Sequence, residues 1–248
     1  VRFVKGLPAA RRAAEFHTLL NALIGELCQA GDHFRLVRDL DAAYKDYVPA
    51  FSQSQTFWYL TRRAHLDATL QRLCKAYDQH KTSLNLRNLL DTVEANLYIF
   101  DDAGFRERMI EHPFVETLAE DARRPDPIQL RADKTTVHED YNVRVKDLMM
   151  WRHLFVAHRD TGKLLKGITL SDQYPLTFTD IGKLLDDGLS IINRYSSLFA
   201  ATTHSRNIVG HDDFLTLLKA VQADIERQER LLQDQLKHLA EQRATDTL

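Results

Sequence analysis

The sequence has few glycines and prolines, only two cysteines and no long apolar run, and each shortage excludes a class of protein. With 9 Gly and 6 Pro in 248 residues, the chain has too few turn formers for an all-β protein, so composition favours helices. No apolar stretch approaches the roughly 18 residues that cross a bilayer. Because the N-terminus also lacks a signal-peptide pattern, we expect a cytoplasmic protein without membrane contacts.

The cysteines and charges exclude further classes. Cys28 and Cys74 are far apart, fit no metal-ligand or redox spacing, and are expected to be buried thiols in a reducing compartment. No His-Glu-x-x-His pattern is present either, so the sequence predicts neither a metal site nor a cofactor. The net charge of −2 provides no global positive field, and any RNA binding has to come from local patches.

Apolar residues recur at helical spacing along most of the chain, which predicts a single all-α domain over residues 1–248. The Phe57-Trp58-Tyr59 triplet is expected in its core. Residues 160–178 are predicted to form a short loop or a β-hairpin with strands at 164–168 and 174–178, followed by an N-cap at Thr179 or Asp180. The expected helices span 9–30 (ended by Gly31), 33–48 (ended by Pro49), 53–78, 83–100, 103–111, 114–122, 128–159, 180–203 and 212–243.

Polar residues interrupt the most apolar of these helices. Arg152, His153 and His158 lie in a segment of Met, Trp, Leu, Phe, Val and Ala that stops at Gly162. Burying a guanidinium and an imidazole costs several kcal/mol unless each has a partner or a task. A fixed cation beside a group that titrates near neutral pH suits chemistry on phosphates.

The spacing of this pair constrains how it acts. Six residues of helix separate Arg152 from His158 by about 9 Å along the axis and place them on different faces. Either the helix loosens before Gly162, or a second copy of the helix supplies the complementary group. The second option predicts a symmetric homodimer as the active unit.

A structural interpretation competes with the catalytic one. Arg152 would then pair with an internal carboxylate, Asp140 or Asp147, and His158 would be a hydrogen-bonded core histidine. Arg206 with His211 repeats the spacing, but these residues fall in a connection between two expected helices.

Arg152-His153-Leu154-Phe155-Val156-Ala157-His158 resembles the motif of HEPN domains: Arg, then Asn, Asp or His, then three to five residues, then His. The continuation Ala157-His158-Arg159-Asp160 is similar to the abortive-infection, AbiU-like branch of that superfamily. So is the stretch from Pro175 to Asp180 that leads into the following helix. The likeness covers about 130–203 as a HEPN-like core, and residues 204–248 are not matched.

The resemblance implies a multi-helix bundle that dimerises through the motif helix and a metal-independent endoribonuclease that needs no cofactor. His158 would act as general acid or base on a ribose 2′-hydroxyl, Arg152 would hold the scissile phosphate, and His153 would orient the site. Arg159 and Lys163 are candidates for contacts with the RNA backbone. Such an enzyme would serve as a toxin or phage-defence effector and would have an antitoxin or another neutralising partner.

Two interpretations from other classes remain beside the nuclease. One is a non-catalytic helical module that binds RNA or a partner protein, and the other is a helical scaffold without affinity for nucleic acid. The apolar stripe of the last helix, within 204–248, is open to two interpretations as well: it is a dimer arm, or it packs on its own bundle.

Overall fold

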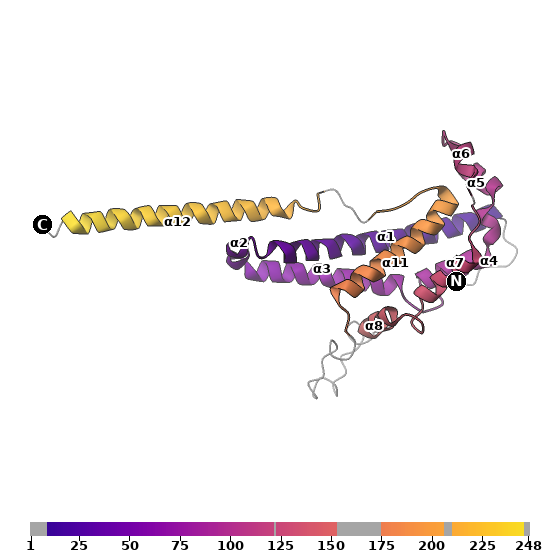
Figure 1. The fold of residues 1–248 in the computed structure, drawn as a ribbon, viewed down its shortest axis with the longest axis horizontal. Coiled ribbons are helices and arrows are strands. Elements are labelled where there is room, and N and C mark those ends of the chain that lie inside the picture. The colour runs from indigo at the N-terminus through magenta and orange to yellow at the C-terminus, as the bar shows by residue number, and fades with distance from the viewer. Residues whose placement is uncertain (1–8, 122, 153–174, 206–209, 246–248) are drawn as a thin grey trace, which may run out of the picture. The chain divides into compact units, whose positions relative to one another are not determined.

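In the computed structural model, residues 9–121, 123–152, 175–205 and 210–245 are described (Figure 1). These residues form ten α-helices and one 3-10 helix and contain no strand, which confirms the predicted all-α fold. None of the helices described is both long enough and apolar enough to cross a bilayer. Contacts divide the chain into two compact units, one of residues 1–32 and 67–206 and the other of 33–66 and 207–248. The predicted single domain remains a prediction.

The first helix is longer than expected. α1 runs from Ala9 to Ala43, straight through Gly31, where the sequence predicted an end. Gly31 itself is buried, and so are Leu27, Ala30 and Phe34 around it. A glycine costs a helix only about 1 kcal/mol relative to alanine, and this packing outweighs that cost.

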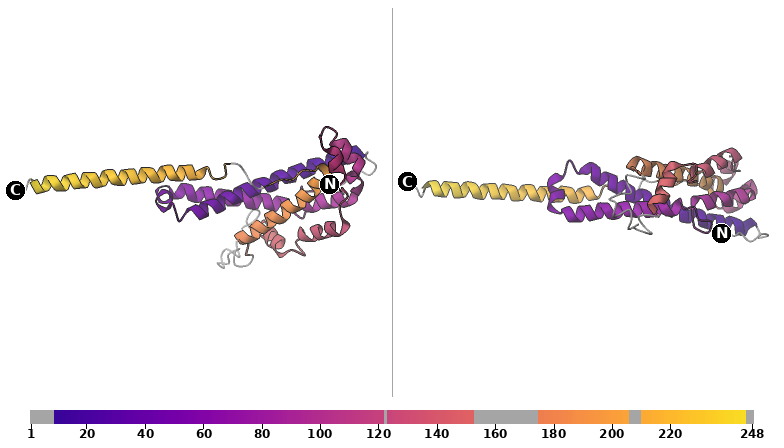
Figure 2. Two further views of the ribbon diagram at one scale, coloured as in Figure 1. Left: turned by 45° about the horizontal axis from the view of Figure 1, so that its top comes forward. Right: turned by 90° about the horizontal axis from the view of Figure 1, so that it is seen from below.

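Pro49 was expected to end a helix at residue 48, but α1 already ends at Ala43 and Pro49 belongs to the start of the next helix. α2 (Val48–Gln53) holds Pro49 in its first turn, where the missing N–H costs nothing. α3 (Gln55–Ala76) follows and lies beside α1 (Figures 1 and 2). The predicted core position of the aromatic triplet is wrong for Phe57 and Tyr59, which are 58% and 66% exposed.

Short elements complete the middle of the chain. They are α4 (Leu86–Ala95), the 3-10 helix η1 (Leu97–Phe100), α5 (Asp102–Arg108) and α6 (Val115–Ala119). Phe100 of η1 packs edge-on against Phe16 of α1 at 5.2 Å between ring centroids. Phe199 lies 5.0 Å from the same ring of Phe16, so this aromatic cluster joins distant parts of the first unit.

The helix expected over 128–159 is interrupted in the structure. α7 (Pro127–Thr136) and α8 (Val143–Trp151) are separated by a turn. Asn142 causes the break, because its side chain donates to the carbonyl of Thr136 at 2.7 Å and accepts from the N–H of Arg144 at 3.1 Å.

The helix after the motif begins earlier than predicted. α11 (Phe178–Ala200) starts at a capping box in which Thr177 and Asp180 each bond the other's backbone N–H, so the expected cap at Thr179 or Asp180 is wrong by two or three residues. Thr177 and Phe178 therefore start a helix and not the second strand of a hairpin. Residues 175 and 176 are in no strand either, and the rest of the predicted hairpin lies outside the described residues.

Within the first unit, α11 packs closely on α1 and on Tyr77 at Gly188. A methyl group there would lie 3.1 Å from the methyls of Leu27 and 3.3 Å from the hydroxyl of Tyr77. The close approach lets Tyr77, which is 1% exposed, donate its hydroxyl to the carbonyl of Leu184 at 2.6 Å. Tyr77 lies just after the end of α3, and this bond therefore ties that end to α11.

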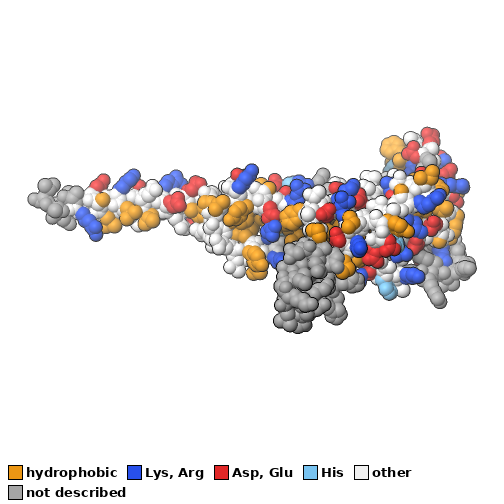
Figure 3. Space-filling model, turned by 60° about the horizontal axis from the view of Figure 1, so that its bottom comes forward, with side chains coloured by type: hydrophobic (Ala, Val, Ile, Leu, Met, Phe, Trp, Pro, Cys, Tyr) orange, Lys and Arg blue, Asp and Glu red, His pale blue; other side chains and the backbone are white. Residues whose placement is uncertain are grey.

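The second unit is built around α2 and the last helix, α12 (Phe214–Thr245). Leu218 is fully buried against Leu40, Ala43, Ala50 and Phe51. Farther along α12, every residue over 226–243 is exposed. Hydrophobic side chains (orange) alternate with charged ones along this part of the helix in Figure 3; its exposed leucines are Leu231, Leu232, Leu236 and Leu239.

We expect Tyr77→Phe to lower the free energy of unfolding by about 1–2 kcal/mol, because the bond to Leu184 is lost without a change in shape. Urea denaturation measures this difference. Tyr141→Phe, at a tyrosine that is 73% exposed, is the control and should change stability by less than about 0.5 kcal/mol. Equal effects of the two substitutions would contradict a structural task for the Tyr77 hydroxyl.

Candidate active site around Arg152

Arg152 follows the last residue of α8. α8 is held in the first unit by three buried side chains, Val145, Leu148 and Met149. The backbone N–H of Arg152 donates to the carbonyls of Leu148 and Met149, so the residue continues the helical path. Its side chain is 38% exposed, and the guanidinium is therefore held by the fold but open to solvent.

The partner of Arg152 is Asp78. Nη1 of Arg152 donates to Oδ1 of Asp78 at 2.5 Å. The Asp78 side chain is only 8% exposed, so one member of the ion pair is buried and the other reaches the surface. Asp78 comes directly after Tyr77, and the bond that ties the end of α3 to α11 therefore also positions this carboxylate.

The Asp78 carboxylate stays ionised in spite of its burial. Burial by itself raises the pKa, but hydrogen bonds from the Ser83 side chain, the His80 backbone N–H and Arg152 outweigh it, so the pKa of Asp78 lies below its usual value. The distance from the His80 nitrogen to Oδ1 is 3.1 Å. The carboxylate is therefore a permanent anion that orients Arg152 at neutral pH.

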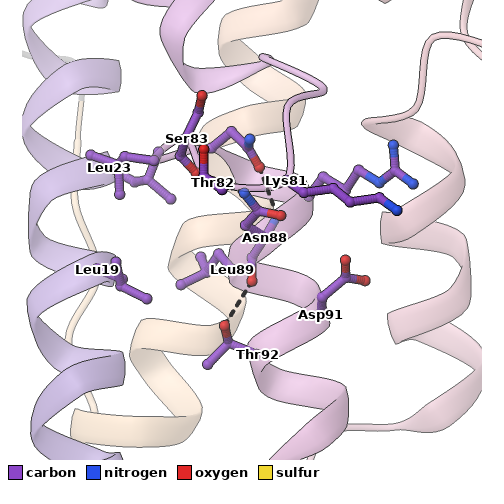
Figure 4. A pocket seen from close by; sticks show the side chains of 12 residues that line it. Leu19, Leu23, Lys81, Thr82, Ser83, Asn88, Leu89, Asp91 and Thr92 are labelled. Carbon is purple, nitrogen blue, oxygen red and sulfur yellow. Dashed lines mark hydrogen bonds between the residues drawn. The ribbon is translucent and has the colours of Figure 1, made fainter. Parts of the chain in front are cut away.

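The loop that supplies these bonds, residues 78–85, is itself held at several points. Nδ1 of His80 accepts from the backbone N–H of Thr82 at 3.3 Å and lies 2.9 Å from the hydroxyl of the same residue. Asn88 donates to the carbonyls of His80 at 3.1 Å and Ser83 at 2.7 Å. On this side the loop, α1 and α4 enclose a hollow of about 440 Å³ (Figure 4).

Both thiols lie in the first unit. Cys74 is buried beside the site, with its sulfur 3.8 Å from the carbonyl of Leu148, and burial raises its pKa to about 12. The prediction of a buried thiol therefore holds for Cys74, and its raised pKa makes it a poor nucleophile. Cys28 is only partly buried, which corrects the expectation for that residue.

Of the predicted site residues, the structure describes Arg152 alone. His153, His158, Arg159 and Lys163 lie outside the described residues, so their assignments remain predictions.

The expected carboxylate partners, Asp140 and Asp147, are not the ones that bind Arg152. Asp140 is exposed and lies 3.5 Å from His138. For Asp147, burial and the nearby charge of Asp180 raise the pKa. The pairing with Asp78 was missed because it spans 74 positions of sequence. The sequence offered one signal for this partner: Asp78 directly follows Tyr77, the last residue on the apolar face of the helix expected over 53–78.

Arg206 and His211 are the competing pair with the same spacing, and the structure describes only His211. Arg206 lies outside the described residues, whereas His211 belongs to the second unit. Its Nε2 is 3.0 Å from Arg35, and its Nδ1 is 3.3 Å from a carboxylate oxygen of Asp39. The ring therefore lies between a cation and a carboxylate of α1. Within the residues that the structure covers, no group of three or more His, Cys, Asp or Glu side chains is arranged to hold a metal ion.

Comparison with known families identifies the chain. It matches the HEPN family model described as AbiU2 over residues 13–239. The chain belongs to this HEPN family. No curated protein and no solved structure matches it. The predicted membership is confirmed, and the match extends well beyond 130–203, into α1 and most of α12. Membership of the HEPN family suggests a nuclease or an abortive-infection type of function.

We expect Asp78→Asn to lower the free energy of unfolding by about 1–2 kcal/mol at neutral pH, a value reduced for the exposure of Arg152. The folded pKa of Asp78 is below its unfolded value of about 3.9, so the charge stabilises the fold above that pH, and this stabilisation is lost as the pH falls through the folded pKa. Urea denaturation between pH 3 and pH 7 measures the difference from the parent chain. A difference that stays constant over this range would contradict the assigned charge.

Proposed function

We propose that this HEPN protein is a metal-independent endoribonuclease that acts as a toxin or phage-defence effector. Arg152 binds the scissile phosphate, His158 serves as general acid or base on the ribose 2′-hydroxyl, and His153 orients the site. Arg159 and Lys163 contact the RNA backbone beside it. The observation that carries the proposal is an exposed Arg152 on a buried, ionised Asp78, in a chain of the HEPN family.

The ion pair suits Arg152 for this task. A guanidinium has five N–H donors in a rigid plane, so the bond from Nη1 to Asp78 fixes the plane without using all of them. The Arg152 side chain is 38% accessible, so its remaining N–H donors can reach a ligand in solvent. A cation that the protein holds in place loses little freedom on binding a phosphate, and it is already oriented for the extra charge of the transition state.

RNA cleavage in EDTA tests the proposal. We expect Arg152→Ala to reduce kcat roughly 10²- to 10³-fold through the loss of a phosphate donor. His158→Ala should reduce it roughly 10²- to 10⁴-fold through the loss of proton transfer. The matched control is Arg144→Ala, because Arg144 lies on the same helix, is 41% exposed and forms a 2.9 Å ion pair with Asp180.

Arg144→Ala should leave cleavage within about twofold of the parent. Parent-like cleavage by Arg152→Ala would refute the assigned site, and dependence on added metal would refute the metal-independent mechanism. Absence of cleavage by the parent, together with RNA binding that weakens steeply with salt, would instead favour a non-catalytic RNA-binding module.

The active unit in this proposal is a homodimer in which one subunit supplies Arg152 and the other supplies His158. The support is helical spacing, because a straight helix carries these two residues on different faces. Mixing the inactive Arg152→Ala and His158→Ala variants should then restore about a quarter of the parent activity, since half of the dimers are mixed and each contains one intact site. Failure of the mixture to regain activity, although sedimentation shows mixed dimers, would place both groups in one subunit.

A neutralising partner completes the proposal. The exposed leucines of α12 are an apolar surface of the kind that proteins use to bind one another, and they support either an antitoxin or the second subunit as its cover.

A further inference from the structure

The second unit contains a hollow lined by aromatic rings. It lies between the end of α1, α2 and the start of α3 and has a volume of about 350 Å³. Four aromatic residues line it: Tyr44, Phe51, Trp58 and Tyr59. Phe51 is buried and is in contact with two of the others, at 5.4 Å between ring centroids from Tyr44 and 5.0 Å from Trp58.

Two of these rings are mostly open to water. Tyr44 is 55% exposed and Tyr59 is 66% exposed, whereas Phe51 is 7% exposed. A cluster whose task is only to stabilise the fold would bury such rings, since each one carries a large apolar surface. The hollow therefore combines a packed apolar floor with accessible aromatic rings, a combination that suits a flat ligand.

Polar groups provide the hollow with a hydrogen-bonding edge. Asp41 and Arg62 both line it and bind each other in a planar, bidentate pair, with 2.6 Å from Nε to Oδ1 and 3.0 Å from Nη2 to Oδ2. Gln55 and Ser52 add amide and hydroxyl groups. A ligand that stacks on rings and also presents donors and acceptors at its rim fits this lining, and nucleobases have this chemistry.

The segment that forms the hollow has a small excess of positive charge. Residues 33–66 carry five Arg or Lys side chains and three Asp, although the whole protein has a net charge of −2. Arg38, Lys45 and Arg63 of this segment are exposed. These cations are the candidates on this segment for contacts with an anionic chain, in a protein without a global positive field.

We propose that this hollow binds an unpaired base of single-stranded RNA, with stacking on Tyr44 and Tyr59 and backbone contacts from the surrounding cations. The inference takes its ligand from the proposed function and adds a second contact with it, outside the Arg152 site. An unpaired base is required because a base in a duplex is already stacked between its neighbours and cannot enter.

Fluorescence of Trp58 reports on occupancy. The chain has 2 Trp, and Trp151→Phe leaves Trp58 as the only one in the full-length protein. The probe is a single-stranded 2′-O-methyl oligonucleotide of about 10 nucleotides, which cannot be cut through its blocked 2′ oxygens. We expect saturable quenching of Trp58 by the single strand and much weaker quenching by the same sequence as a duplex.

A matched pair of substitutions locates the contact. Tyr59→Ala, made in the Trp151→Phe chain, should weaken binding of the probe roughly 5- to 150-fold, the range found for one stacked base. Phe57→Ala is the control, because Phe57 lies two residues away on α3 and is 58% exposed but does not line the hollow. This substitution should change affinity less than about twofold. Because both side chains are exposed, neither truncation should unfold the chain.

The results separate this inference from the proposed nuclease. Equal effects of Tyr59→Ala and Phe57→Ala, or no quenching of Trp58, would overturn the base-binding hollow even where the parent cuts RNA. A change in oligomeric state on Tyr59→Ala, with RNA affinity unaltered, would identify a protein contact and also overturn it. Quenching that is lost with Tyr59→Ala, in a chain that cuts no RNA, would support the hollow and refute the nuclease.

Discussion

The end of α3 is the point on which the arrangement of the candidate site depends. Two consecutive residues there, Tyr77 and Asp78, bind different parts of the first unit. Tyr77 binds the carbonyl of Leu184 and joins α3 to α11, and Asp78 accepts from the loop over 78–85 and from Arg152. A buried carboxylate is stable only with such partners, because taking a charge out of water without compensation costs several kcal/mol. The packing of the first unit and the direction of the exposed guanidinium therefore have a common origin in this short segment.

The two members of the ion pair between Asp78 and Arg152 differ in their burial. The anion is buried and saturated with hydrogen bonds, whereas the cation reaches solvent at the end of α8. The pair of Arg144 with Asp180 provides a contrast, because Asp180 belongs to the capping box of α11 and both partners are more accessible. Arg144 and Arg152 are similar in exposure and in having an Asp partner. They differ in the burial of that partner, because Asp78 is buried more deeply than Asp180.

Periodicity was sufficient to predict the helical class and most of the helices, because apolar residues at three-and-four spacing mark a buried face wherever it lies. It was insufficient where tertiary packing decided the outcome. Gly31 did not end α1 because its neighbours are buried, and Phe57 and Tyr59 are exposed although aromatic composition favoured the core. The motif made Arg152 a candidate, but its partner Asp78 is remote in sequence and follows from the fold alone. The break at Asn142 had a local cause, a side chain that competes with the helix for backbone groups.

The exposure of α12 over 226–243 affects how readily proteases cleave this segment. Over 226–243, the helix has few tertiary contacts to prevent it from opening, because every residue there is exposed. Most of the stability of a helix in a protein comes from tertiary packing, and this exposed segment has little of it, so it opens locally at a lower cost than the packed helices. Proteases cut opened segments, so this part of α12 should be cleaved before the packed helices, and a surface that covered its leucines would slow the cleavage.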